Sequence, residues 1–147
     1  MRQPVIILIP AILVLLTGNL LAAQYLPPDI TATAAYTDIP IGQAVHIDYV
    51  TPRHHNGKIL YTLMSPFPGQ IPIGFGYCLP LAHPVTLMGY SLVAANKASF
   101  HFSVPMDPGL VGAKILFAAM VCDGTPIGTG ASNNVLCTIR QEDWPLP

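Results

Sequence analysis

Three side chains that can bind metals follow one another at even spacing in the middle of this sequence. Cys78, His83 and Met88 lie in the segment GYCLPLAHPVTLM with four residues between neighbours, and His46 lies upstream in an alternating run. A thiolate and two imidazoles bind copper strongly, and a more distant thioether tunes its reduction potential. These four residues form the candidate copper set of the chain.

The same residues have an ordinary structural interpretation, which we favour. YCLPL has the composition of a β-strand, the His83-Pro84 pair is typical of a turn, and Met88 suits an irregular gap in a core. About three further strands are expected after Cys78, whereas the ligand loop of a small copper carrier precedes the last strand. We therefore expect no metal and no cofactor.

His54 and His55 form a second candidate site, with His46 and Asp48 nearby in the expected hairpin. Such residues can bind Zn²⁺. Adjacent histidines on a turn diverge, however, and no CxxC motif fixes them. We expect solvated loop histidines here.

Hydrolytic chemistry has no recognisable motif in this chain. No serine lies in a GxSxG elbow, and the seven acidic residues are scattered, with Glu142 and Asp143 together near the end. No glycine-rich loop precedes a helix that would bind phosphate. We expect a protein that is not an enzyme.

The three cysteines permit one disulfide and one remaining thiol. Cys122 and Cys137 flank the turn-rich segment DGTPIGTGASNNVL, so they are the preferred pair across the base of a hairpin. Cys78 would then be free; its pairing with one of the other two stays open.

The N-terminus, Met1 to Ala23, carries one positive charge and a long uncharged apolar run that ends in small residues. This pattern is typical of a secretory signal peptide with an apolar helix. An uncleaved membrane anchor is the alternative, because the uncharged stretch approaches the roughly 20 residues that span a bilayer. The chain as a whole has a net charge of −1, which argues against nucleic acid as a partner.

Short β-prone runs separated by proline, glycine, asparagine and aspartate fill the rest of the chain. The sequence predicts eight strands: residues 30–36, 44–51, 58–65, 76–81, 85–91, 98–104, 113–122 and 134–140. Asn56-Gly57 predicts a hairpin between the second and third of these. We expect an all-β fold, a single antiparallel sandwich of about seven to eight strands with Greek-key, immunoglobulin-like connections.

The segments IPIGFGYCLPL, FHFSVPMDPGLVGAKILFAAMVCD and GTGASNNVLCTI make the chain resemble a small secreted domain that recurs in the secretomes of planctomycete-type bacteria. The resemblance covers about residues 42–139 and implies a β-sandwich with no assigned activity. The cysteine, histidine and methionine segment also resembles, more weakly, the copper loop of a cupredoxin.

The sequence thus divides into a leader (1–23), a linker with the first strand (24–41), a sandwich (42–140) and a tail (141–147). We expect an exported, non-enzymatic module that is structural or binds a partner at the cell surface or outside the cell. The partner would be a second copy, another secreted protein or a glycan, and a membrane only if the leader is uncleaved. A small copper electron carrier is the alternative.

Overall fold

A computed structural model describes residues 25–141 of the chain. The predicted leader and most of the predicted tail lie outside these residues. Within them, the chain is built from β-strands and two short 3-10 helices, so the predicted all-β class is confirmed. No helix among residues 25–141 has the length and hydropathy to cross a bilayer.

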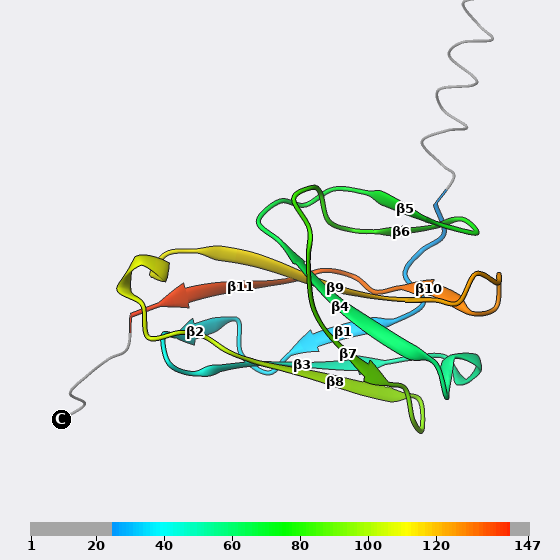
Figure 1. Cartoon of the computed structure of the whole chain (residues 1–147), viewed down its shortest axis with the longest axis horizontal. Helices are drawn as coiled ribbons and strands as arrows, with labels where there is room; N and C mark the ends of the chain where they lie inside the picture. The colour runs from blue at the N-terminus through cyan, green and yellow to red at the C-terminus, as the bar shows by residue number, and fades with distance from the viewer. Residues whose placement is uncertain (1–24, 142–147) are drawn as a thin grey trace, which may run out of the picture.

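The strands form a sandwich with an added hairpin (Figure 1). The first sheet has the order β1 (Thr31–Ala34), β3 (Ala44–Val50), β8 (Lys97–Ser103). The second has the order β2 (Asp38–Pro40), β11 (Val135–Arg140), β9 (Lys114–Cys122), β4 (Ile59–Ser65), β7 (Thr86–Leu92), with β10 (Thr129–Ala131) also paired to β9. Strands β5 (Ile71–Gly74) and β6 (Tyr77–Leu79) pair only with each other.

The main core lies between the first and second sheets. Val45, Ile47 and Tyr49 of β3 point into it, and Phe117 and Val121 of β9 meet them from the other side. Alternation along each strand places the intervening residues on the outer faces. The chain passes from one sheet to the other on both sides of β2, between β3 and β4, and on both sides of β8, as in Greek-key, immunoglobulin-like sandwiches.

A second, smaller core covers part of the outer face of the second sheet. Leu116 and Ala118 alternate with Phe117 on β9, so they face away from the main core. Leu79 and Leu81, in and just after β6, pack on them. This third layer explains why the segment from Ile115 to Val121 is apolar on both faces, as expected for a central strand.

The predicted hairpin at Asn56-Gly57 is wrong. Strands β3 and β4 belong to different sheets, and η1 (Arg53–His55) lies between them. Asn56 has φ −57° and ψ 135°, and Gly57 has φ 80°. These values are typical of a type II turn, whereas the type I′ turn of a tight hairpin requires positive φ at both positions.

A tight two-residue turn occurs instead at Ala95 and Asn96. Their φ values are 52° and 63°, and Ala94 and Lys97 exchange both backbone hydrogen bonds at 3.0 Å. This is the type I′ pattern. The turn carries the chain from β7 in one sheet to β8 in the other.

All eight predicted strands are present, with ends shifted by a few residues, and three short strands were missed. Strands β2 and β5 contain Pro40 and Pro72, which lie at the end of a sheet and in the isolated hairpin. Proline is tolerated there because an edge position needs no ladder N–H. Strand β2 pairs in parallel with β11, an exception to the antiparallel pattern. Strands β1 and β2, from the segment assigned to linker and first strand, both belong to the sandwich.

Candidate functional site

Large apolar side chains line the outer face of the second sheet beyond the part that the β5–β6 hairpin covers. Across β4 and β7, Ile59 is opposite Leu92, Tyr61 is opposite Tyr90, and Leu63 is opposite Leu87. Directly opposed residues of an antiparallel pair project from the same face. We call the set Ile59, Tyr61, Leu87, Tyr90 and Leu92 the apolar face.

Most of the apolar face is open to solvent. Tyr90 is 75% exposed, Leu92 62%, Leu87 56% and Ile59 45%. Isolated exposed apolar residues are normal on a protein surface, but a contiguous group of them marks an interaction site more often than chance. The apolar face is therefore the strongest candidate binding surface among the described residues.

Strand β7 also forms one end of the second sheet. Its sequence, TLMGYSL, contains neither a charged residue nor a proline. Natural edge strands are commonly protected by lysine, proline or a covering segment. The bulge near Met88, opposite Thr62 and Leu63, is the one protective feature along this strand.

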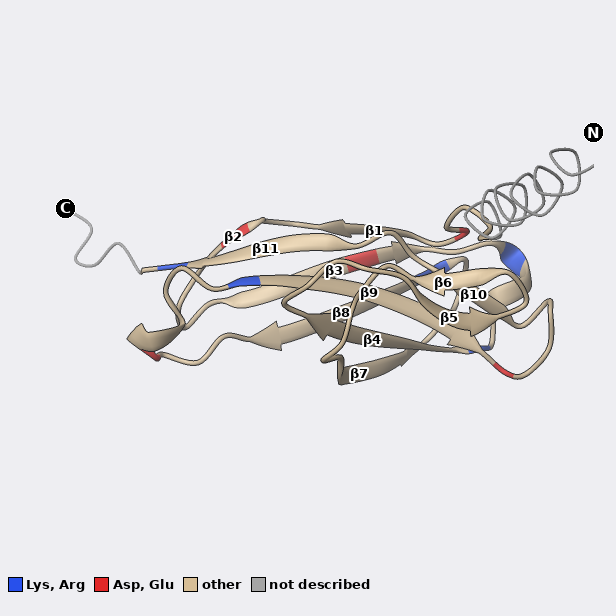
Figure 2. Cartoon of the chain, turned by 90° about the horizontal axis from the view of Figure 1, so that it is seen from above, with Lys and Arg blue, Asp and Glu red and all other residues tan. Residues whose placement is uncertain are grey.

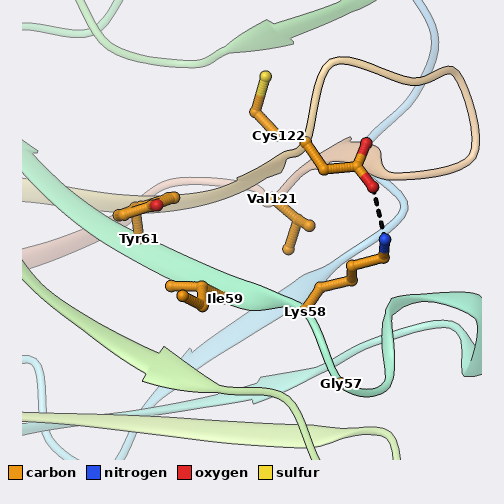
Figure 3. Close-up of a pocket in the computed structure, with 7 residues that line it drawn as sticks. Gly57, Lys58, Ile59, Tyr61, Val121 and Cys122 are labelled. Atoms are coloured by element: carbon orange, nitrogen blue, oxygen red, sulfur yellow. Dashed lines mark hydrogen bonds and ion pairs between the residues drawn. The ribbon is translucent and has the colours of Figure 1, made fainter.

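A shallow pocket of about 240 Å³ adjoins the apolar face, lined in part by Ile59, Tyr61 and Cys122 (Figure 3). At its end, Nζ of Lys58 donates to Oδ2 of Asp123 at 2.5 Å. Lys58, followed by hydrogen bonds from Thr125, holds the pKa of the Asp123 carboxyl well below its usual range. The ion pair leaves the pocket with balanced charge.

Charge is sparse over the whole described chain (Figure 2). The complete sequence has six lysine and arginine residues and seven acidic residues. Among residues 25–141, no single-sign patch adjoins the apolar face, because Lys58 and Asp123 neutralise each other. This face therefore offers apolar contacts rather than charge.

The structure does not bring the candidate copper set together. His46 projects from the outer face of the first sheet, where its Nε2 lies 2.9 Å from Asp48 Oδ1. Cys78 lies in β6, on the far side of the second sheet. Met88 packs against the main core. These residues lie in different layers, so they form no common coordination centre.

The predicted Cys122–Cys137 disulfide is wrong, because all three cysteines are free. Cys122 is opposite Thr129 of β10, whereas Cys137 is opposite Ile115. Ile115 and Cys122 are seven positions apart along β9, which is roughly 23 Å at the rise of a strand. Burial raises the pKa of the Cys78 and Cys137 thiols, so less of the reactive thiolate is present and their reactivity is lower.

The two adjacent histidines differ in environment, so the expectation of solvated histidines is wrong for His55. His54 is exposed, while His55 is fully buried. Nε2 of His55 lies 2.7 Å from Oδ2 of Asp29. Asp29 stands 26 residues earlier, and no local pattern marks it as a partner. His46 and Asp48, expected nearby, lie in another layer of the fold, where His46 Nδ1 is 2.9 Å from His101 Nδ1.

Ser65 and Ser132 have hydrogen bonds that hold the fold together. Oγ of Ser65 donates to the carbonyl of Ala82 at 2.5 Å. Oγ of Ser132 accepts from the amide of Ala119 at 2.7 Å and so joins the end of β10 to β9. Both are buried, which suits a structural role.

No protein-family model matches this sequence, and no curated protein matches it. Among solved structures, the chain is similar to a chitin-binding domain from Burkholderia pseudomallei, with a TM-score of 0.38 and 13% identity over 69% of this chain and 55% of that one. It is also similar to Spo0M, a sporulation control protein from Bacillus subtilis, with a TM-score of 0.40 and 8% identity over 81% and 52%. The chain spans about half the length of each of these structures. Similarity at this level assigns neither a ligand nor a partner to this chain.

Proposed function

We propose that this chain is an exported, non-enzymatic binding module that associates with a second copy of itself through the apolar face and the edge of β7. The observation that carries the proposal is the run of exposed apolar residues in register at an uncharged sheet edge. Export is supported by the apolar leader, Met1 to Ala23.

The edge of β7 suits a symmetric contact. Two copies of an edge strand can pair antiparallel about a two-fold axis, so that the same patch serves both partners. Because TLMGYSL carries no charge, such pairing brings no like charges together. It also continues the apolar face from one copy to the next and places Tyr90 and Leu92 beside side chains of the second copy, which removes part of their apolar surface from water.

The experiment is sedimentation velocity on the purified wild-type protein and on single variants. All of them are prepared with the same N-terminal residue, so that they differ only at the substituted position. The wild type is expected to be a dimer. Tyr90→Lys, which places a charge at the centre of the contact, is expected to shift the protein to monomer. Tyr36→Lys is the matched control, because Tyr36 is 74% exposed but lies between β1 and β2, away from the apolar face.

Two outcomes contradict the proposal. One is a wild-type protein that stays monomeric at the highest concentration tested. The other is an equal loss of the dimer in Tyr36→Lys and Tyr90→Lys, which would place the contact elsewhere. Circular dichroism of each variant checks that the β fold is retained.

A glycan is the second candidate partner, favoured by the cross-strand pair Tyr61 and Tyr90. Tyrosine offers a flat apolar ring with a polar hydroxyl at its end, which suits a binding surface that stays partly exposed to water. Cosedimentation with insoluble polysaccharides such as cellulose and chitin tests this alternative. Tyr90→Ala should release the protein from the polysaccharide, and a wild type that binds neither polysaccharide removes the candidate.

A further inference from the structure

Three segments that are distant in the sequence meet around the buried His55. They are the stretch before β1, which contributes Asp29; η1, which contributes His54 and His55; and β10, which contributes Gly130. One ligand atom each from Asp29, His54 and His55 lies within 4.8 Å of the others. Ligands around a tetrahedral zinc ion are roughly 3.4 Å apart. The three groups therefore lie close enough together to belong to one metal site.

The hydrogen bond between Asp29 and His55 defines which imidazole nitrogen is available. Because Nε2 of His55 lies 2.7 Å from a carboxylate oxygen, the neutral ring carries its proton on Nε2 and leaves the Nδ1 lone pair bare. Metal-binding histidines very often donate their second ring N–H to a carboxylate in this way. The pair thus has the arrangement in which Nδ1 binds a metal and Asp29 orients the ring.

Nδ1 of His55 is buried and has no hydrogen-bond partner among the described residues. An unpaired buried nitrogen costs free energy and requires an explanation. A bound metal ion satisfies it. The ring of His54 lies beside that of His55, with centroids 4.3 Å apart, so it can supply a second imidazole from the solvent side.

The backbone of β10 closes the other side of the cluster. A Cβ atom on Gly130 would lie 2.5 Å from Asp29 Oδ1 and 2.6 Å from His55 Nε2. Asp29 Oδ1 also accepts from the amide of Ala131 at 3.0 Å. Asp29 and His55 are therefore held in place before any ion binds, which is the preorganisation that a metal site needs.

We propose that Asp29, His54 and His55 form a binding site for a divalent transition metal such as Zn²⁺. The two imidazoles bind the ion, Asp29 holds His55 within reach of it, and water completes the coordination on the exposed side of His54. Imidazole and carboxylate donors are the ligand chemistry of zinc, nickel and copper(II) rather than of calcium or magnesium. This site is separate from the apolar face and independent of self-association.

The test is calorimetric titration of the purified protein, without a histidine tag, with ZnCl₂. Binding of one Zn²⁺ per chain is expected. His54→Ala is the diagnostic variant, because His54 is exposed and its loss leaves the buried Asp29–His55 pair intact. His54→Ala should weaken Zn²⁺ binding at least tenfold, because even the loss of a residue that only orients a metal ligand lowers metal affinity by about that factor. Its melting temperature without metal should stay close to that of the wild type.

His101→Ala is the matched control, since His101 on β8 pairs with His46 on β3, on the outer face of the first sheet, and forms the rival pair of histidines. It should bind Zn²⁺ as the wild type does. Absence of Zn²⁺ binding in the wild type overturns the proposal, as does unchanged binding in His54→Ala. Loss of binding in His101→Ala alone would move the site to the outer face of the first sheet and overturn it as well. Co²⁺ absorption of the wild type provides an independent readout, because tetrahedral coordination by imidazole gives visible bands.

Discussion

Tyr49 and Thr62 join the two sheets of the sandwich by a hydrogen bond inside the main core. Oη of Tyr49 on β3 lies 2.9 Å from Oγ1 of Thr62 on β4. Both side chains are almost entirely buried. Each hydroxyl therefore replaces the hydrogen bond to water that the other loses on burial, which avoids the large free-energy cost of an unpaired buried hydroxyl.

Removal of one of these hydroxyls should destabilise the fold. Tyr49→Phe and Thr62→Val each leave an unpaired buried oxygen, so each should lower the free energy of unfolding by about 1 to 3 kcal/mol. The double variant should lose less than the sum, because no unpaired group remains. Urea denaturation of the four proteins measures the coupling, and strictly additive losses would contradict the bond.

The same tyrosine predicts a loss of stability at high pH. Burial raises the pKa of Tyr49 from 10.0 to about 12 in the folded protein. Above pH 10 the unfolded chain gives up this proton first, so the unfolded state gains stability relative to the native one. The contribution of Tyr49 is thus complete below pH 10 and is lost between about pH 10 and 12. Urea midpoints measured across that range should fall more steeply for the wild type than for Tyr49→Phe; equal slopes would contradict the prediction.

The Asp29 carboxylate should be a strong contributor to stability. It accepts from Ala131 and bonds to the buried ring of His55. Asp29→Ala removes both interactions and should lower the free energy of unfolding by about 2 kcal/mol or more. Asp38→Ala, at an exposed position of β2, is the control and should change it by less than about 0.5 kcal/mol. Thermal or urea unfolding of the two variants measures these losses, and equal losses in Asp29→Ala and Asp38→Ala would contradict the prediction.

Gly130 should tolerate no side chain. Its Cβ would clash with Asp29 and with Nε2 of His55 at 2.6 Å or less, so Gly130→Ala should displace the pair and destabilise the protein by about 1 to 3 kcal/mol. Combined with Asp29→Ala, the substitution should cost much less, because one of the clashing groups is gone. A full additional loss in the double variant would show that the clash is not with Asp29.

Thiol reactivity should follow the exposure of the three cysteines. Cys122 is exposed, Cys78 is partly buried and Cys137 is buried. A thiol reagent added to the native protein should modify Cys122 first, and the denatured protein should show three reactive thiols without prior reduction. Cys122→Ser should remove the fast phase. Detection of a Cys122–Cys137 bridge by mass spectrometry would contradict the register of β9 and β11.

Ala95 should be a position where glycine stabilises the fold. It adopts φ 52° in the two-residue turn between β7 and β8, a conformation that costs a residue with a Cβ roughly 1 to 2 kcal/mol. Part of this gain is offset by the greater freedom of glycine in the unfolded chain. Ala95→Gly should therefore raise the free energy of unfolding by up to about 1 kcal/mol. Ala98→Gly in β8, the control, should lower it, and a decrease for both variants would argue against the strained turn.

The apolar face was not predicted from the sequence for a specific reason. Along β7, Leu87, Tyr90 and Leu92 share one face although the first two are three residues apart, because a bulge near Met88 interrupts the alternation. A period-two pattern therefore does not connect them. Their exposure also depends on how far the β5–β6 hairpin extends over the sheet, which no local pattern encodes.

By itself, the sequence determined the β class, the eight main strands and the apolar character of β9 on both faces. These features follow from local composition and alternation, which burial imposes on each strand separately. Only the tertiary structure decided which strands are neighbours, and with them the separation of Cys122 from Cys137, the placement of Asp29 against His55 and the exposure of Tyr90. Pairing between distant segments depends on turn conformation and on the packing of whole layers. Asn56-Gly57 in a type II turn and Ala95-Asn96 in a type I′ turn show how a few backbone angles redirect the chain from one sheet to the other.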